Sequence, residues 1–254
     1  SSAGFITVVP DYIGFGSSAD QFHPYYVEEA TANAVIDNLR AAAELAAEKK
    51  VKFNERLFLA GYSQGGYATM AAHKYIEEMG LADFDLIASF PAAGGYDIKE
   101  MQEYFFSQTT YDQPHYLAYV ALSYRTYYDW PENALSDFFN EPYPTAIPGL
   151  FNGTNGPGTI NGMLTENVQE LVTSGLILNI DTDAKYGYLV DAFEENSLTD
   201  WAPAVPMFMY HGDADTTVPH INSVSTYEQL IQNGASPTVL TMTTLPGADH
   251  GSGI

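Results

Sequence analysis

The chain has 254 residues, 46% hydrophobic and 14% aromatic, which are the proportions of a globular protein and exclude a disordered one. Nine basic residues against 32 acidic ones give a net charge of -23, which disfavours nucleic acid and anionic membranes as partners. No apolar run approaches the roughly 18 residues that a membrane-spanning helix needs, so stable insertion into a membrane is not expected. The lack of cysteine excludes disulfides and thiolate metal sites.

Strand-like and helix-like segments alternate along much of the chain, which is typical of an α/β protein with a mostly parallel sheet. A long alanine-rich segment at residues 27–49 predicts the first crossover helix. Right-handed crossovers would bring the carboxyl ends of the strands to one edge of the sheet. The expected strands lie near residues 5–9, 57–60, 85–90, 205–210 and 238–244.

Residues 96–200 interrupt this alternation and predict a helical cap, inserted into a core formed by residues 1–95 and 201–254. Three prolines between residues 141 and 149 predict a connecting loop there. The cap is rich in aromatic side chains, which either pack it internally or form an apolar acyl or aryl pocket. Helices are expected at residues 118–128, 131–139, 161–173 and 182–194.

A serine stands between a strand-like and a helix-like segment, in Gly-Tyr-Ser-Gln-Gly at residues 61–65. Such a serine is forced onto a sharp turn that holds its hydroxyl out of the sheet, the geometry of a nucleophile elbow. We expect Gly61 and Gly65 to be required, because a Cβ at either position would collide with the neighbouring strand or helix. The backbone N–H of Gln64 opens the helix and can point at an oxyanion near Ser63.

A serine hydroxyl is a poor nucleophile at neutral pH and needs a base, for which position favours His250. His250 follows the last expected strand, which agrees with the order serine, acid, histidine found in serine hydrolases built on α/β sheets. The other five histidines precede the serine, lie in helical stretches or flank the acid: His23, His73, His115, His211 and His220.

Two aspartates compete for the role of the acid that orients the histidine. Asp213 and Asp215 follow a buried strand and a glycine turn, and at this spacing they cannot both face the same imidazole. Asp215 is preferred because it comes one turn past the strand and just before a Val-Pro pair that fixes a helix start, while Asp213 stays an alternative. Asp249, beside His250, is interpreted as a turn residue.

Four segments resemble known family motifs. A segment at residues 8–16, Val-Val-Pro-Asp-Tyr-Ile-Gly-Phe-Gly, followed by His-Pro-Tyr at 23–25, resembles the secretory lipase and related bacterial esterase branch. That branch belongs to the α/β-hydrolase superfamily. The other three segments resemble motifs of that superfamily: Gly-Tyr-Ser-Gln-Gly-Gly at 61–66, Gly-Asp-Ala-Asp-Thr-Thr-Val-Pro at 212–219 and Gly-Ala-Asp-His at 247–250.

The resemblance implies an α/β-hydrolase-type sheet with helices on both faces, and it implies that the backbone N–H of Asp11 joins that of Gln64 in an oxyanion hole. The family pattern has several strands before the Asp11 segment and a helix after the catalytic histidine. Here ten residues precede Asp11 and four follow His250. We therefore expect either a piece of a longer protein or a minimal five-stranded sheet whose exposed edge favours a homodimer. A secreted or periplasmic location in a bacterium is also implied.

These features together predict a serine carboxylic-ester hydrolase, an esterase or lipase that acts on a small-molecule ester or lipid through Ser63, His250 and Asp215. No cofactor is expected. No metal is expected either, since Asp181 and Asp183 lack the further ligands of a calcium loop. A prolyl-type serine peptidase, an acyltransferase or thioesterase, and a catalytically silent binding domain remain alternatives.

Overall fold

The computed structural model describes residues 4–253, so residues 1–3 and 254 of the predicted core lie outside the described part. The chain divides into two compact units. The first comprises residues 1–23, 28–97 and 198–254, and the second comprises residues 24–27 and 98–197.

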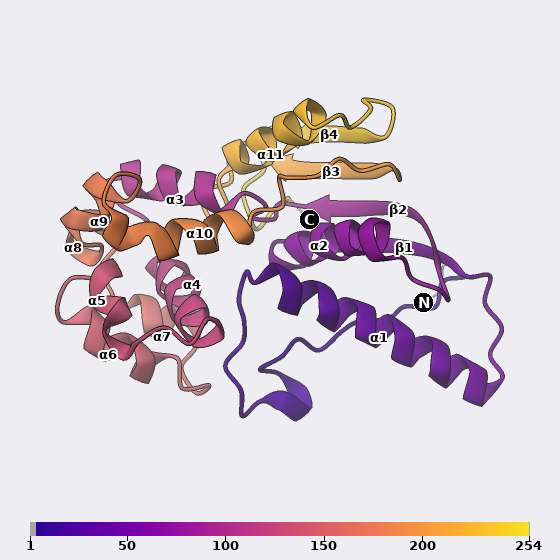
Figure 1. The fold of residues 1–254 in the computed structure, drawn as a ribbon, viewed down its shortest axis with the longest axis horizontal. Helices are drawn as coiled ribbons and strands as arrows, with labels where there is room; N and C mark the ends of the chain where they lie inside the picture. Colours follow the sequence, from indigo (N-terminus) through magenta and orange to yellow (C-terminus); the bar gives the residue numbers. More distant parts are fainter. Residues whose placement is uncertain (1–3, 254) are drawn as a thin grey trace. The chain divides into compact units, whose positions relative to one another are not determined.

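The first unit contains a four-stranded sheet in the order β1-β2-β3-β4, with every neighbouring pair parallel (Figure 1). The strands β1 and β2 pair along their lengths, as do β3 and β4. Between β2 and β3 the register comprises Ser89 opposite Met207 and Ala92 opposite Tyr210. The predicted mostly parallel sheet is confirmed. The strands are β1 (Arg56–Tyr62), β2 (Asp85–Ala92), β3 (Met207–Gly212) and β4 (Leu240–Leu245).

The helices of the first unit pack on this sheet and on each other. Helix α1 (Glu28–Lys49), predicted at residues 27–49, packs on α2 (Gln64–Met79), which contacts β1 and β2. Helix α11 (His220–Gln232) contacts β3 and β4, and a short 3-10 helix, η1 (Gly16–Ser18), lies before α1. The core between α1, α2, β1 and β2 is formed by Ile36, Leu39, Leu57, Leu59, Ala72, Ile76, Leu81 and Leu86.

The strand predicted at residues 5–9 is wrong, because this segment is not paired in the sheet. Phe5, Ile6 and Val9 are 59, 60 and 79% exposed. The Phe5 ring meets the Phe58 ring of β1 edge-on, with 5.8 Å between centroids. The segment thus contacts β1 through a side chain rather than through a hydrogen-bonded ladder, and an apolar pattern by itself does not supply a ladder partner.

The second unit is helical. Antiparallel bridges join Thr110 to Asn167 and Phe139 to Val172. Tyr124 is fully buried and donates its hydroxyl to the carbonyl of Tyr26 at 2.9 Å, so at least part of the aromatic content forms the packing of this unit. Its helices are α3 (Ile98–Ser107), α4 (Pro114–Tyr127), η2 (Glu132–Ala134), α5 (Leu135–Phe138), α6 (Tyr143–Leu150), α7 (Pro157–Asn161), α8 (Val168–Leu171), α9 (Ser174–Asn179), η3 (Ala184–Tyr186) and α10 (Gly187–Glu195).

Two local predictions for this unit are wrong. Residues 141–149 are mostly helical, because Pro144 falls in the first turn of α6, where an N–H has no intrahelical acceptor, and Ile147 is fully buried. The helix predicted at 161–173 is interrupted between α7 and α8. There Asn167 caps a new helix start by accepting from the backbone N–H groups of Gln169 and Glu170.

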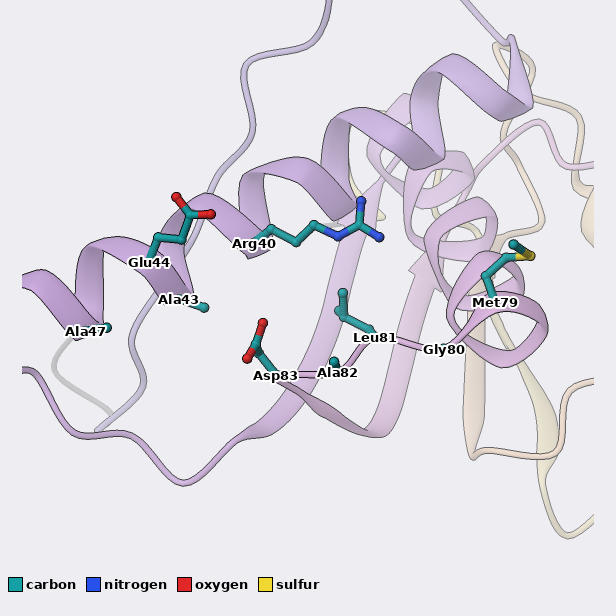
Figure 2. A pocket seen from close by; sticks show the side chains of 9 residues that line it. All are labelled: Arg40, Ala43, Glu44, Ala47, Met79, Gly80, Leu81, Ala82 and Asp83. Atoms are coloured by element: carbon teal, nitrogen blue, oxygen red, sulfur yellow. The ribbon is translucent and has the colours of Figure 1, made fainter.

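An open cavity of about 770 Å³ lies between α1 and residues 79–83, at the carboxyl end of α2 (Figure 2). Arg40 and Glu44 of α1 and Asp83 line it. Because α2 runs antiparallel to the strands it connects, this is the edge of the sheet opposite the carboxyl ends of the strands. Within residues 4–253, no helix is long and apolar enough to cross a membrane.

Candidate active site

Ser63 stands on a strained turn between the end of β1 and the start of α2. Its backbone angles, φ 57° and ψ -124°, are unfavourable for a residue with a Cβ. Its N–H donates to the carbonyl of Ala92 at 2.9 Å, and its own carbonyl accepts from Gly66 and Tyr67. Gln64 is therefore the first residue of α2, where backbone N–H groups have no intrahelical acceptor.

The elbow requires glycine at two positions, one of which differs from the prediction. A Cβ on Gly61 would lie 2.0 Å from the carbonyl oxygen of Gly65, so Gly61 is needed as expected. A Cβ on Gly65 would meet nothing within 4 Å, so the predicted collision there is wrong. The crowded position is Gly66, where a Cβ would lie 2.4 Å from the carbonyl oxygen of Ala92 in β2. Helix α2 thus approaches the sheet one residue later than expected.

Gly65 and Gly66 provide a matched pair of variants for measuring stability. We expect Gly66→Ala to lower the free energy of unfolding by about 1–3 kcal/mol, because the added methyl group would meet the backbone of Ala92, which cannot move aside as a flexible side chain could. We expect Gly65→Ala to be neutral or to raise it by about 0.5–1 kcal/mol, since alanine favours a helix and the space is open. Urea unfolding of both variants measures the difference, and an equal loss in both would contradict the packing described.

The structure brings the three predicted residues Ser63, His250 and Asp215 together. Ser63 Oγ lies 2.9 Å from His250 Nε2, and His250 Nδ1 lies 2.6 Å from Asp215 Oδ2. The His250 side chain is 20% exposed, whereas that of Asp215 is 1% exposed. An imidazole whose Nδ1–H donates to a carboxylate presents an unprotonated Nε2 to the serine hydroxyl, as a general base requires.

Hydrogen bonds surround the Asp215 carboxylate. Oδ1 accepts from the backbone N–H groups of Thr217 at 2.9 Å and Val218 at 3.0 Å. Oδ2 accepts from His250 and also from His211 Nε2, at 3.2 Å. Burial acts to raise the pKa of Asp215, but the hydrogen bonds from His211, His250 and Val218 outweigh it and hold the pKa well below its ordinary value. The group is therefore an anion at neutral pH.

This lowered pKa predicts a pH-dependent contribution to stability. A carboxyl group whose pKa is depressed by folding stabilises the folded state above its unfolded pKa of about 3.9, and this contribution is lost as the pH falls toward the folded pKa. The difference in free energy of unfolding between the native protein and Asp215→Asn should therefore be largest above about pH 4 and shrink below it. Urea unfolding at several pH values from 6 to 3 measures it, and a constant difference would contradict the assignment.

The alternative acid, Asp213, contacts a different group. Its Oδ1 accepts from the backbone N–H of Gly247 at 2.6 Å, so it anchors the loop that carries His250 rather than the imidazole. Asp249 accepts from Ser252 and Gly251 in a local turn. Asp215 is thus the aspartate in contact with His250, and Asp249 has the turn contacts that the sequence suggested.

Two residues that support the site carry no local sequence signal for this role. Tyr62 donates its hydroxyl to the carbonyl of His250 at 2.6 Å and so anchors the loop that bears this histidine. His211 is fully buried. Its Nε2 donates to both Asp215 and the carbonyl of Val218, while its Nδ1 lies 2.6 Å from Ser223 Oγ. The Tyr62 contact joins residues 188 apart in the chain, which only the folded sheet brings together, whereas the contacts of His211 lie within the end of β3 and the loop and helix that follow it.

Asp11, the second predicted oxyanion donor, lies in the loop before η1. A Cβ on Gly16, which has φ +56°, would lie 2.5 Å from Asp11 Oδ2, so the carboxylate packs on this glycine. The oxyanion-hole role of the Asp11 and Gln64 N–H groups stays a prediction.

A second array of serine, histidine and acid is excluded by burial. His73 Nδ1 lies 2.7 Å from Ser89 Oγ, and His73 Nε2 lies 2.8 Å from Glu77 Oε1. Ser89 and His73 are fully buried, so no substrate reaches this serine. Glu77 also accepts from the backbone N–H groups of Ala204 and Val205, which makes the array a brace between α2 and the start of β3. Among residues 4–253 no cluster of three or more potential metal ligands occurs.

The chain is similar to lipases and esterases. The family model for secretory lipases matches residues 2–92. Lipase 5 of Candida albicans is 26% identical over 92% of this chain, which spans 48% of that protein. A Legionella pneumophila protein of known structure is 26% identical, with a TM-score of 0.85 over 98% of this chain and 66% of that one. The rice cell wall degrading esterase LipA from Xanthomonas oryzae is 23% identical, with a TM-score of 0.81 over 96% of this chain and 64% of that one.

The protein therefore has the α/β-hydrolase fold, as the sequence motifs predicted. Within that fold it resembles the secretory lipases, which confirms the resemblance indicated by residues 8–16 and 23–25. The chain spans about half the length of the curated relative and slightly less than two thirds of the solved structures.

Proposed function

We propose that the protein is a serine carboxylic-ester hydrolase with Ser63 as nucleophile, His250 as general base and Asp215 as the acid that orients it. The observation that carries this proposal is the continuous hydrogen-bonded chain from Ser63 Oγ through His250 to Asp215, at 2.9 and 2.6 Å. The strained backbone of Ser63 supports it, because such turns expose a nucleophile above the sheet.

In the proposed reaction, His250 Nε2 takes the proton of Ser63 while Oγ attacks the ester carbonyl carbon. The carbonyl electrons move onto its oxygen, and the backbone N–H groups of Gln64 and Asp11 stabilise this oxyanion. The tetrahedral intermediate then collapses, and the imidazolium protonates the departing alcohol. Water, deprotonated by His250, attacks the acyl-enzyme in the same way and releases the acid, which regenerates Ser63.

The proposed substrates are small-molecule esters or lipids, since the relatives named above are a lipase and an esterase. Secretion is proposed from the similarity to secretory lipases. The helical unit of residues 98–197 is proposed to serve as the cap that gives acyl selectivity, in line with the insertion predicted at 96–200. A homodimer stays a prediction that light scattering on the purified protein tests.

Hydrolysis of p-nitrophenyl esters from acetate to palmitate, together with labelling by a fluorophosphonate, tests the proposal. Ester turnover with labelling at Ser63 supports it, and the best chain length reports the size of the acyl pocket. Cleavage of prolyl amides without ester turnover would favour a peptidase, and transfer of the acyl group to added alcohols in preference to water would favour an acyltransferase. Absence of both labelling and turnover would favour a silent binding domain.

A further inference from the structure

His23 lies at the junction of the two segments that carry the proposed oxyanion donors. It is 5% exposed and belongs to the first unit, together with Ser63 and α2. Its Nδ1 contacts the loop that begins at Asp11, and its Nε2 contacts Gln64. The reaction steps described above do not use it.

The loop after Asp11 is built around His23. His23 Nδ1 donates to the carbonyl of Ile13 at 2.7 Å, and the rings of Tyr12 and Phe15 lie 5.8 and 5.0 Å from the imidazole. Gly14 has φ +92°, and a Cβ there would lie 2.8 Å from the backbone of His23. Each of the four residues that follow Asp11 therefore meets His23 or packs directly against its backbone.

The same imidazole reaches the elbow. His23 Nε2 lies 2.5 Å from the side-chain nitrogen of Gln64, the residue whose backbone N–H is the other proposed donor. Because Nδ1–H donates to Ile13, the neutral ring presents Nε2 as an acceptor, and the Gln64 amide donates to it. Burial lowers the pKa of His23 despite the opposing hydrogen bonds, which favours this neutral form at pH 7.

Other hydrogen bonds run within the loop itself. The N–H of Phe15 donates to the carbonyl of Tyr12, and the N–H of Gly14 donates to Ser18 Oγ. The loop is largely exposed and has no regular secondary structure before η1. The hydrogen bonds of His23 therefore connect the loop that follows Asp11 to Gln64, the first residue of α2.

We propose that His23 is a positioning residue for the oxyanion hole, which holds the Asp11 loop against Gln64 through its two ring nitrogens. This inference rests on the proposed function. A donor pair held at a fixed spacing binds the oxyanion of the transition state better than the planar ester, so the bridge should act on kcat more than on KM.

Two variants of the native chain test the bridge by ester hydrolysis. Gln64→Met keeps the length of the side chain but removes the donor, and we expect kcat to fall about 10-fold with little change in KM. His23→Phe keeps a ring but removes both hydrogen bonds, and we expect a fall of about 10- to 100-fold. The double variant should be no slower than His23→Phe, because the two residues act through one contact.

A conservative variant and a matched control separate positioning from folding. His23→Asn keeps an N–H near the Nδ1 position for Ile13 but cannot reach Gln64, so its kcat should match that of Gln64→Met rather than that of His23→Phe. His73→Leu removes another buried histidine from the brace between α2 and β3, so it should lower Tm without lowering kcat. Unchanged kcat in both Gln64→Met and His23→Phe, or equal effects of all histidine variants, would overturn the proposal.

Hydrogen exchange of the peptides that cover residues 11–18 distinguishes this proposal from the proposed function. Faster exchange there in Gln64→Met supports the bridge even if the native protein hydrolyses no ester, in which case the proposed function alone fails. Exchange that is unchanged in Gln64→Met and in His23→Phe overturns the bridge, whether or not the native protein is an active esterase.

Discussion

Replacing Ser63 by alanine is expected to lower kcat for p-nitrophenyl ester hydrolysis by about 10⁶-fold, since the variant lacks the hydroxyl on which the proposed acyl-enzyme forms. His250 Nε2 then has no hydroxyl to deprotonate, although the pair with Asp215 persists. The residual rate reflects substrate binding and the oxyanion donors alone. Burst-phase kinetics on an activated ester, with the native protein beside the variant, measure the loss.

The matched control for this variant is Ser236→Ala, which removes a hydroxyl from the exposed turn before β4. Its kcat should equal that of the native protein. If Ser63→Ala kept the native rate while the native protein turned over esters, the assignment of the nucleophile would be wrong.

Replacing Asp215 by asparagine is expected to lower kcat by about 10⁴-fold at neutral pH. The asparagine amide can donate to His250 Nδ1, which places the ring proton on Nε2 and leaves no acceptor for the serine proton. His211 would lose a charged acceptor for Nε2 as well. Steady-state kinetics with one ester substrate measure the fall in kcat, and KM should change little.

Asp213→Asn is the control for that variant, because it changes a neighbouring carboxylate in the same turn. An asparagine Oδ1 can still accept from the N–H of Gly247, so we expect less than about a 10-fold change. The reverse ranking, with Asp213→Asn the more damaging, would identify Asp213 as the acid instead.

The parts of the fold that the sequence predicts best are those defined by short-range patterns. The strands that end at the site begin and end within a few residues of their expected limits, because buried apolar runs and glycine turns mark them locally. The contacts of Ser63, Asp215 and His250 follow from the same rule, since parallel strands deliver their carboxyl ends to one edge.

Apart from the local cap at Asn167, which interrupts the helix predicted at 161–173, the errors come from contacts between segments far apart in the chain. Residues 5–9 have the apolar content of a strand but no ladder partner, and residues 143–150 form a helix despite prolines because Ile147 is buried. The close packing of Gly66 and the hydrogen bond of His23 depend on the backbone of Ala92 and on the Gln64 amide, neither of which a local pattern contains. The sequence motifs therefore indicated Ser63, Asp215 and His250 but not the residues that pack around them.

Few residues pair between β2 and β3, and this boundary in the sheet separates Ser63 from Asp215 and His250. Ser63 follows β1, on one side of that boundary, whereas Asp215 follows β3 and His250 follows β4, on the other. The chain between β2 and β3 spans residues 93–206, so bringing the two sides together closes a long loop and is a slow kind of step in folding. A nascent chain that has completed only β1, α2 and β2 thus carries Ser63 without Asp215 and His250, and the proposed catalytic array can assemble only once the last strand has formed.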